Sequence, residues 1–264
     1  DYANGPTHAF WSEFRAATRA VKPDAVTIGE IVETADLQRS YQGRLDGTLD
    51  FLLLQQIRSF FAFETVSASE FDHFLRRHLS YFPADYVLPS FLDNHDMNRF
   101  LWVVKGDKRT LNLAAICQFT LPHPPIVYYG SEVGLNQERD LEYPDGSRRP
   151  EESRVLMPSV DEEDGDLRSF FTVLIGLRRN NLGLWEGKRT TLAASDDGFY
   201  AVRIDATSGS AIVTLNRSDT AHALQIPAGA TIWIQSEAVT KSDNDGWLVA
   251  PRAGAVFYIE PDTA

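Results

Sequence analysis

The segment Asp93–Asp96 places two carboxylates, an amide and an imidazole directly after an apolar run. Two further acids, Asp1 and Glu30, stand where an apolar strand ends or where a preceding strand would end. Carboxyl groups that converge at strand ends are what cleavage of a glycosidic bond requires. One attacks the sugar carbon and another protonates the leaving oxygen. We therefore expect Asp1, Glu30 and Asp96 to work as one carboxylate site.

Each of these residues also has an ordinary structural explanation. Asp1 can simply mark where the chain begins, and Glu30 can cap a following helix. Asp, Asn and His form turns by bonding their own backbone, so the segment 93–96 can be a turn. Tyr128 and Tyr129, at another expected strand end, can be core or rim aromatics. Their shared placement at strand ends favours the chemical interpretation.

A metal site is not expected. His95, Asp93 and Asp96 resemble a ligand set, but neighbours on one extended chain point in different directions. The sequence also has no serine-centred elbow, no glycine-rich phosphate loop and no HExxH motif.

The composition is typical of a folded globular protein, with 264 residues, 43% apolar and 23% charged. A net charge of −12 argues against a nucleic-acid partner, because phosphates would be repelled. No apolar run reaches the length needed to span a membrane. The single cysteine, Cys117, excludes an internal disulfide. Because the sequence starts without methionine, we expect it to be part of a longer protein.

The first two thirds of the sequence alternates helical patterns with short, continuously apolar strands, which is typical of a parallel β/α architecture. Helices are expected over residues 6–22, 51–63, 67–82, 108–121 and 167–181, and strands over 24–30, 45–51, 86–93 and 124–130.

After residue 184 the pattern changes to short strands separated by Gly, Asp, Ser and Asn, which predicts an antiparallel β-sandwich. We therefore expect two domains, at 1–183 and 184–264. A closed (β/α)8 TIM barrel needs eight strands, and only about four precede the change. The expected fold is α/β: the second half of such a barrel, followed by an all-β antiparallel sandwich.

Several motifs resemble those of the α-amylase family of glycoside hydrolases, in the expected order along the chain. The closest likeness is to the neopullulanase, cyclomaltodextrinase and maltogenic amylase group. The seventh-strand motif F-x-x-N-H-D corresponds to Phe91, Asn94, His95 and Asp96. The other similar stretches are "DYANGPTHAFWSEF", "TIGEIVE", "LPHPPIVYYGSEVGL" and "RRPEESRVLMP".

The resemblance implies a retaining hydrolase that cleaves α-glucosidic bonds in starch-like glucans or maltooligosaccharides. Asp1 falls on the nucleophile position and Glu30 on that of the general acid and base. Asp96 would hold ring hydroxyls with the help of His95. Further substrate-binding residues implied by the likeness are Asn94, Arg99 and Tyr129.

The expected partners are the glucan substrate and a missing N-terminal barrel half, with no nucleic acid and no membrane. No cofactor is expected, and calcium is left open only for that missing part. The expected location is cytoplasmic. Two alternatives stay open: a transglycosylase or isomerase acting on maltose- or sucrose-like sugars, and a non-catalytic amylase-like subunit that binds sugar.

Overall fold

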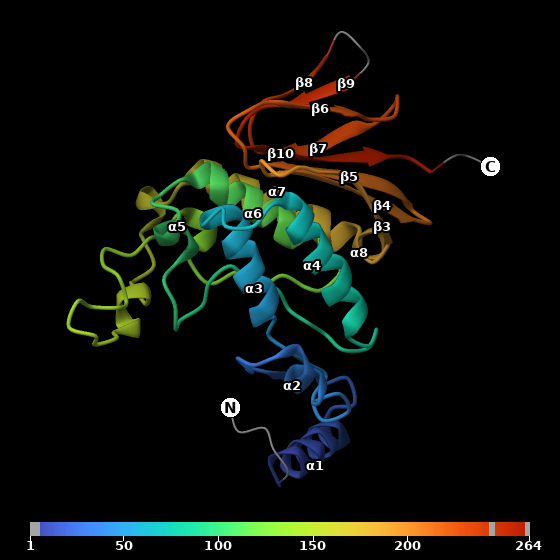
Figure 1. Cartoon of the computed structure of the whole chain (residues 1–264). Helices are drawn as coiled ribbons and strands as arrows, with labels where there is room; N and C mark the ends of the chain where they lie inside the picture. The colour runs from blue at the N-terminus through green and yellow to red at the C-terminus, as the bar shows by residue number, and fades with distance from the viewer. Residues whose placement is uncertain (1–5, 243–245, 262–264) are drawn as a thin grey trace.

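The structure is a computed structural model that describes residues 6–242 and 246–261. Figure 1 shows three levels: antiparallel sheets at one end, a layer of helices in the middle, and a small N-terminal part at the other end. No helix in these ranges has both the length and the apolar character to cross a membrane.

The N-terminal part contains two helices and two very short strands. Pro6 begins the first helix, as its fixed backbone angle favours. The elements are α1 (Pro6–Val21), β1 (Ile28–Gly29), α2 (Ala35–Arg39) and β2 (Gly47–Thr48).

Four segments of the first two thirds pair in parallel, one after another. Ile28 in β1 lies opposite Gly47 in β2, and Gly47 forms a parallel bridge with Val87. A further parallel bridge joins Ser90 to Pro125. The carboxyl ends of these segments therefore lie at the same edge, as the alternating sequence pattern predicts.

The third and fourth of these segments were expected as full strands, but the structure shows only bridges there. Pro89, Pro124 and Pro125 explain the difference, because proline has no N–H to donate to a ladder. Their carbonyl groups still accept: Asp50 N donates to Pro89 O over 3.0 Å, and Ser90 N donates to Pro124 O over 3.0 Å.

The helical layer follows the expected helices closely. Asp50 caps α3, and Ser67 with Glu70 forms a capping box at α4. The expected helix over 51–63 ends in a π-helical turn, η1. The elements are α3 (Phe51–Ile57), η1 (Arg58–Ala62), α4 (Ala68–Tyr81), α5 (Phe100–Val103), α6 (Lys108–Phe119), η2 (Ser131–Val133), η3 (Pro150–Ser153), η4 (Val160–Glu162), α7 (Gly165–Asn180) and α8 (Leu182–Trp185).

The C-terminal strands form two antiparallel sheets, with orders β3-β4-β5-β10-β7 and β6-β9-β8. A cluster of buried side chains that includes Phe199, Ile212, Val249 and Phe257 contains members of both sheets. The strands are β3 (Lys188–Ala194), β4 (Phe199–Ala206), β5 (Gly209–Asn216), β6 (His222–Gln225), β7 (Thr231–Gln235), β8 (Val239–Lys241), β9 (Gly246–Val249) and β10 (Ala253–Ile259).

One hydrophobic core joins the helical layer to the larger sheet. Helix α6 packs on β5 and β10. Gly254 in β10 permits this approach, because a Cβ there would lie 2.7 Å from Leu113 Cδ2. Buried side chains of both parts, among them Phe171 and Val213, belong to the same cluster. The expected domain boundary at residues 183 and 184 stays a prediction.

Candidate active site

Glu30 directly follows β1, at the edge where the parallel segments end. The backbone there is fixed by a hydrogen bond from Leu49 N to Gly29 O (2.9 Å). The side chain of Glu30 is exposed. It borders a cavity of about 380 Å³ that Trp11 and Tyr41 also line. An exposed carboxyl beside aromatic side chains is open to a ligand from solvent.

Asp96 stands in the loop after the third parallel segment, and that loop folds back on itself. Asp96 N donates to Asn94 Oδ1 over 2.9 Å, while His95 Nε2 lies 3.3 Å from Asp96 Oδ2. The three neighbouring residues therefore form one unit. About half of the Asp96 side chain, 47%, stays exposed.

Two arginines from the loop before α7 fix this unit from outside. Arg154 Nη2 donates to Asp96 Oδ1 over 2.7 Å, and Arg154 Nε donates to His95 O over 2.9 Å. Arg148 Nη2 donates to Asp96 O over 2.5 Å. The Arg154 contact holds one carboxylate oxygen of Asp96, so the orientation of this acid depends on a segment far along the chain.

Asp93 is buried and acts as a structural acid beneath the loop. Its Oδ2 accepts from Phe100 N over 2.7 Å, and Ser131 Oγ donates to Oδ1 over 3.2 Å. Burial raises the pKa of Asp93, and the Phe100 amide and the nearby charges of Arg58 and Arg99 limit the rise. The acid thus ties the loop to α5 and to the end of the fourth parallel segment.

Arg99 was expected to bind substrate, but its side chain is 0% exposed. Its Nη1 donates to Tyr129 O over 2.9 Å and its Nε to Ser153 O over 3.0 Å. The guanidinium also lies 4.7 Å from the ring centre of Tyr128. Because no part of Arg99 reaches the surface, its burial does not support the expected direct contact with a sugar, which stays a prediction.

Tyr129, the other expected binding residue, is 40% exposed. Its hydroxyl donates to Val155 O over 2.6 Å, and its ring packs edge-on against Tyr128. The ring therefore has a fixed position with one part open to solvent. This is consistent with a sugar contact.

The structure brings Asn94, His95 and Asp96 together. Tyr129 is linked to this group through the loop before α7, where its hydroxyl donates to Val155 O and the neighbouring Arg154 bonds to Asp96. Among the described side chains, Glu30 forms no hydrogen bond or ion pair with this group. Asp1 lies outside the described residues. In the same ranges, no three His, Cys, Asp or Glu side chains are grouped so that they could hold a metal ion.

Sequence reasoning missed the contribution of Arg148 and Arg154. Both stand in the stretch "SRRPEESR", to whose arginines the family resemblance assigns no individual role. A pair of arginines in a loop that follows a strand end indicates a contact with carboxylates or carbonyls, because guanidinium groups bind these acceptors. The partner could not be found from spacing, since 58 positions separate Arg154 from Asp96.

The sequence matches the family model described as "Alpha amylase, catalytic domain" over residues 1–173. The chain therefore belongs to the α-amylase family. It is 40% identical to Alpha-amylase 2 of Dictyoglomus thermophilum over 189 residues, which is 71% of this chain and 33% of that protein. It is 30% identical to a cyclomaltodextrinase of Geobacillus thermopakistaniensis over 266 residues, covering all of this chain and 41% of the relative.

Solved structures agree with this membership. A cyclomaltodextrinase matches with a TM-score of 0.79 and 25% identity over 97% of this chain and 44% of that one. The α-amylase of Geobacillus thermoleovorans, solved with acarbose, matches in fold with a TM-score of 0.78 and 22% identity, over 97% and 58%. The chain thus spans about a third to two fifths of the curated relatives named above.

Proposed function

We propose that this chain is the C-terminal part of a retaining glycoside hydrolase that cleaves α-glucosidic bonds in starch-like glucans or maltooligosaccharides. The observation that carries the proposal is the parallel order of β1, β2 and the segment at Val87. That order puts the end of β1, with Glu30, and the loop of Asp96 at one edge, where catalytic residues of such folds stand.

In this proposal the three acids have different roles. Asp1 attacks the anomeric carbon and forms a covalent intermediate, and Glu30 protonates the leaving oxygen and later activates water. Asp96 binds ring hydroxyls through its exposed part, while Arg154 fixes its other side. Tyr129 contacts the sugar, and we assign Arg99 the role of positioning Tyr129 and the backbone of Ser153 from below.

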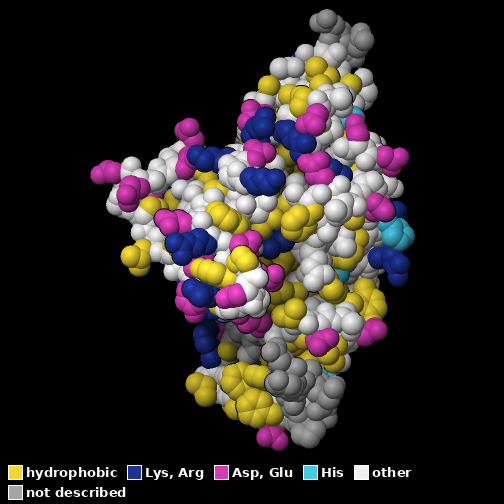
Figure 2. Space-filling view, turned by 60° about the vertical axis from the view of Figure 1, so that its left-hand side comes forward, with side chains coloured by type: hydrophobic (Ala, Val, Ile, Leu, Met, Phe, Trp, Pro, Cys, Tyr) yellow, Lys and Arg dark blue, Asp and Glu magenta, His cyan; other side chains and the backbone are white. Residues whose placement is uncertain are grey.

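We further propose that the four parallel segments are the second half of a (β/α)8 barrel and that the remaining half covers their open side. Supporting this, apolar side chains are exposed around α1 and β1. Figure 2 shows apolar side chains gathered at the lower end of the molecule, where Figure 1 places α1. The exposed residues there are Phe10 (56%), Val21 (89%), Val26 (65%) and Ile28 (37%).

The remaining expectations stay proposals. The two antiparallel sheets form the terminal β-sandwich domain of the enzyme. The location is the cytoplasm, in line with a relative in Bacillus subtilis that is named an intracellular maltogenic amylase. Hydrolysis and transfer to an acceptor sugar share the first chemical step, so product analysis at high maltose concentration separates them.

The test uses the longer protein that contains this chain, with maltotriose as substrate. Glu30→Gln should lower kcat by at least about 10³-fold, because it removes the proton that the leaving oxygen needs. Glu33→Gln is the matched control, since it makes the same change at another exposed glutamate three positions away. It should leave kcat within about twofold, as expected for a glutamate outside the proposed machinery.

Near-normal turnover by the Glu30→Gln variant would overturn the assignment. The configuration of the first product tests the mechanism independently. An α-anomer, observed by NMR before mutarotation, supports retention, whereas a β-anomer would contradict the covalent role of Asp1.

A further inference from the structure

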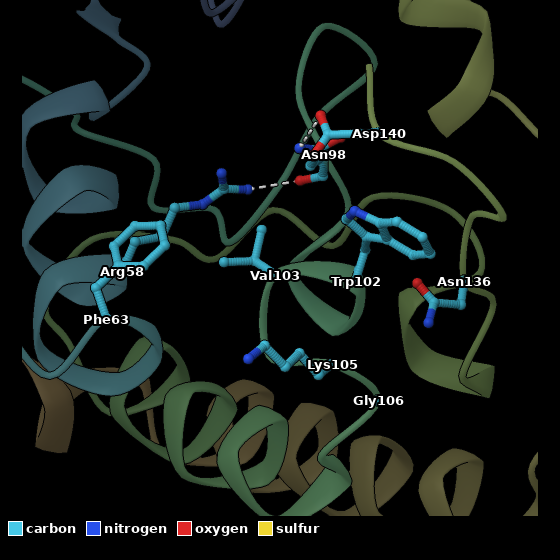
Figure 3. Close-up of a pocket in the computed structure, with 9 residues that line it drawn as sticks. All are labelled: Arg58, Phe63, Asn98, Trp102, Val103, Lys105, Gly106, Asn136 and Asp140. Carbon is cyan, nitrogen blue, oxygen red and sulfur yellow. Dashed lines mark hydrogen bonds between the residues drawn. The ribbon is translucent and has the colours of Figure 1, made fainter. Parts of the chain in front are cut away.

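A second cavity lies beside α5, and none of the expected catalytic residues lines it. Its volume is about 660 Å³, within the usual range for sites that take small molecules. We call it the Trp102 pocket, and Figure 3 shows it. The residues that matter here are Arg58, Phe63, Trp102, Lys105, Asn136 and Asp140.

The pocket offers aromatic surface. Phe63, which directly follows η1, is 56% exposed, and Trp102 is partly exposed. Figure 3 shows the two aromatic side chains on opposite sides, with Val103 between them. Aromatic faces that stay open to solvent favour ligands that carry flat apolar surface.

Polar groups on the other side of the pocket have bonding capacity left. Asp140 Oδ1 accepts from Asn98 Nδ2 and from Glu142 N, each over 3.0 Å, which fixes the carboxylate. Asn136 Oδ1 accepts from Gln137 N over 2.9 Å. The indole N–H of Trp102 also lies beside the Asp140 carboxylate, whereas Asn136 Nδ2 donates to no other described residue. A fixed carboxylate and an amide donor therefore border the space that a ligand would enter.

Three charged side chains line the pocket: Arg58, Lys105 and Asp140. Arg58 donates to Leu92 O and Asn98 O over 3.0 and 2.8 Å, and the charge of Asp93 lies close behind it. Lys105 is exposed and faces the same space as Asp140. Lys105 and Asp140 are opposite charges on the pocket wall, and Arg58 directs its donors at carbonyl groups of the protein itself.

Lys105 is held in an unfavourable backbone conformation. Its φ is +55°, and the next residue, Gly106, has φ +81°. A left-handed conformation costs a residue other than glycine about 1–3 kcal/mol, and Glu64 and Arg252 adopt it as well. The turn directs the backbone so that a flexible ammonium group borders the pocket.

We propose that the Trp102 pocket binds a neutral oligosaccharide, with one sugar ring lying against Trp102 and its hydroxyls bonded to Asp140, Asn136 and Lys105. A pyranose ring has an apolar C–H face and a rim of hydroxyls that both donate and accept. This matches an aromatic wall that has a fixed carboxylate, an amide and an ammonium around it. The site goes beyond the proposed hydrolysis, because it needs neither Asp1, Glu30 nor Asp96.

The experiment titrates the 264-residue chain with maltotriose and follows the indole N–H signals of its five tryptophans by NMR. One signal should shift in the wild type, and it should be the one that Trp102→Phe removes. Trp102→Ala should weaken binding at least about tenfold, since the ring loses its stacking surface. Trp247→Ala is the matched control: it removes another partly exposed tryptophan and should leave affinity within twofold.

Asn136→Ala and Lys105→Asn keep the aromatic wall and test the polar side. Each should weaken binding about three- to tenfold, the usual size for one net hydrogen bond. Asparagine tolerates the left-handed backbone at position 105. These two surface variants keep the proposal testable even where Trp102→Ala fails to fold.

Two results would overturn the proposal. One is loss of maltotriose binding in Asp96→Asn with unchanged binding in Trp102→Ala, which would locate the sugar at the candidate active site. The other is a shift of the Trp102 signal by inorganic phosphate but not by maltotriose, which would make the pocket an anion site. Neither result bears on turnover by Glu30, so this proposal and the proposed hydrolysis fail separately.

Discussion

The two ends of the molecule are stabilised in different ways. At the sheet end, nearly every residue of β5 is buried, and the strand shares a core with α4, α6 and α7. At the other end, Ile28 in β1 is 37% exposed, and a small cluster around Tyr41 and Tyr86 is the main apolar support. Charged contacts to Asp46 supply much of the rest.

The difference indicates in which part of the molecule the strands are covered by other residues of this chain. A parallel strand is normally covered on both faces, yet β1 has one face open. The antiparallel strands at the sheet end have partners within this chain and bury their shared face. We attribute the open face of β1 to the absence of the other, N-terminal half of the proposed barrel, and three predictions test the comparison.

The largest effect is expected from Phe71→Ala, which removes a side chain at the junction of the helices and the larger sheet. Phe71 stacks on Phe60 at 4.5 Å and meets Tyr200 in β4 at 5.8 Å. The variant should lose about 4 kcal/mol of unfolding free energy. Urea denaturation followed by far-UV circular dichroism and by tryptophan fluorescence measures it.

Both probes should move together, because the helices and the sheet share one core. Phe63→Ala is the control, since that ring is 56% exposed, and it should cost less than about 0.5 kcal/mol. If one of the two probes kept its wild-type urea midpoint in Phe71→Ala while the other shifted, the helices and the sheet would unfold independently.

A smaller and local effect is expected from Asp46→Asn at the opposite end. Asp46 Oδ1 accepts from Arg15 Nη2 over 2.8 Å and from Arg19 Nη2 over 2.5 Å. Thr27 N donates to Asp46 Oδ2 over 2.8 Å. Burial opposes ionisation, but the bonds from Arg15 and Thr27 outweigh it and hold the pKa of Asp46 below its ordinary value. The variant should lose about 2 kcal/mol.

The lowered pKa of Asp46 fixes the pH dependence of this contact. The carboxylate contributes its stabilisation above the unfolded-state pKa, about 4, and loses it as the pH falls through the lower folded-state value. Protection of the α1 amides against hydrogen exchange, measured relative to the intrinsic rate at each pH, should fall over that acidic range in the wild type. In Asp46→Asn this protection should be low already at neutral pH, with the amides of α6 unaffected. An equal loss of protection in α6 would contradict a local role.

The smallest effect on stability is expected from Val26→Lys on the open face. Val26 is 65% exposed, so unfolding free energy should change by less than about 0.5 kcal/mol. Exposed apolar patches promote association, and the lysine should reduce self-association of the chain. Sedimentation should show the average mass falling toward 29.6 kDa. A wild-type chain that stays monomeric at high concentration would contradict self-association through the apolar face around Val26.

Periodicity in the sequence predicted the helices well. The structure confirms a helix at each of the five expected places. Ser67 and Asp164 cap two of these helices, because their side chains accept hydrogen bonds from free backbone N–H groups of the first turn. Two strands of the C-terminal sheets have little apolar pattern in the sequence. β3 alternates exposed and partly buried residues at the edge of its sheet, and β8 has only three residues. Edge strands bury little, so their sequences carry a weak apolar signal.

The candidate site was predictable only where its residues are neighbours in the sequence. Asn94, His95 and Asp96 follow one another, so the sequence motif itself predicts that they act together. The burial of Arg99 was not readable, because a charged residue beside a polar motif is usually exposed. Its position depends on Tyr128, Tyr129 and the carbonyl of Ser153, which only the folded loops bring to it.

The contact between Arg154 and Asp96 also sets an order of events during folding. Closing a loop of 58 residues costs roughly 3–4 kcal/mol in chain entropy. A partly exposed ion pair returns at most about 1 kcal/mol. The pair therefore forms only after the parallel segments have joined at Ser90 and Pro125. During synthesis, Asp96 leaves the ribosome before Arg154. The carboxylate of Asp96 is therefore oriented late, after the surrounding core has formed.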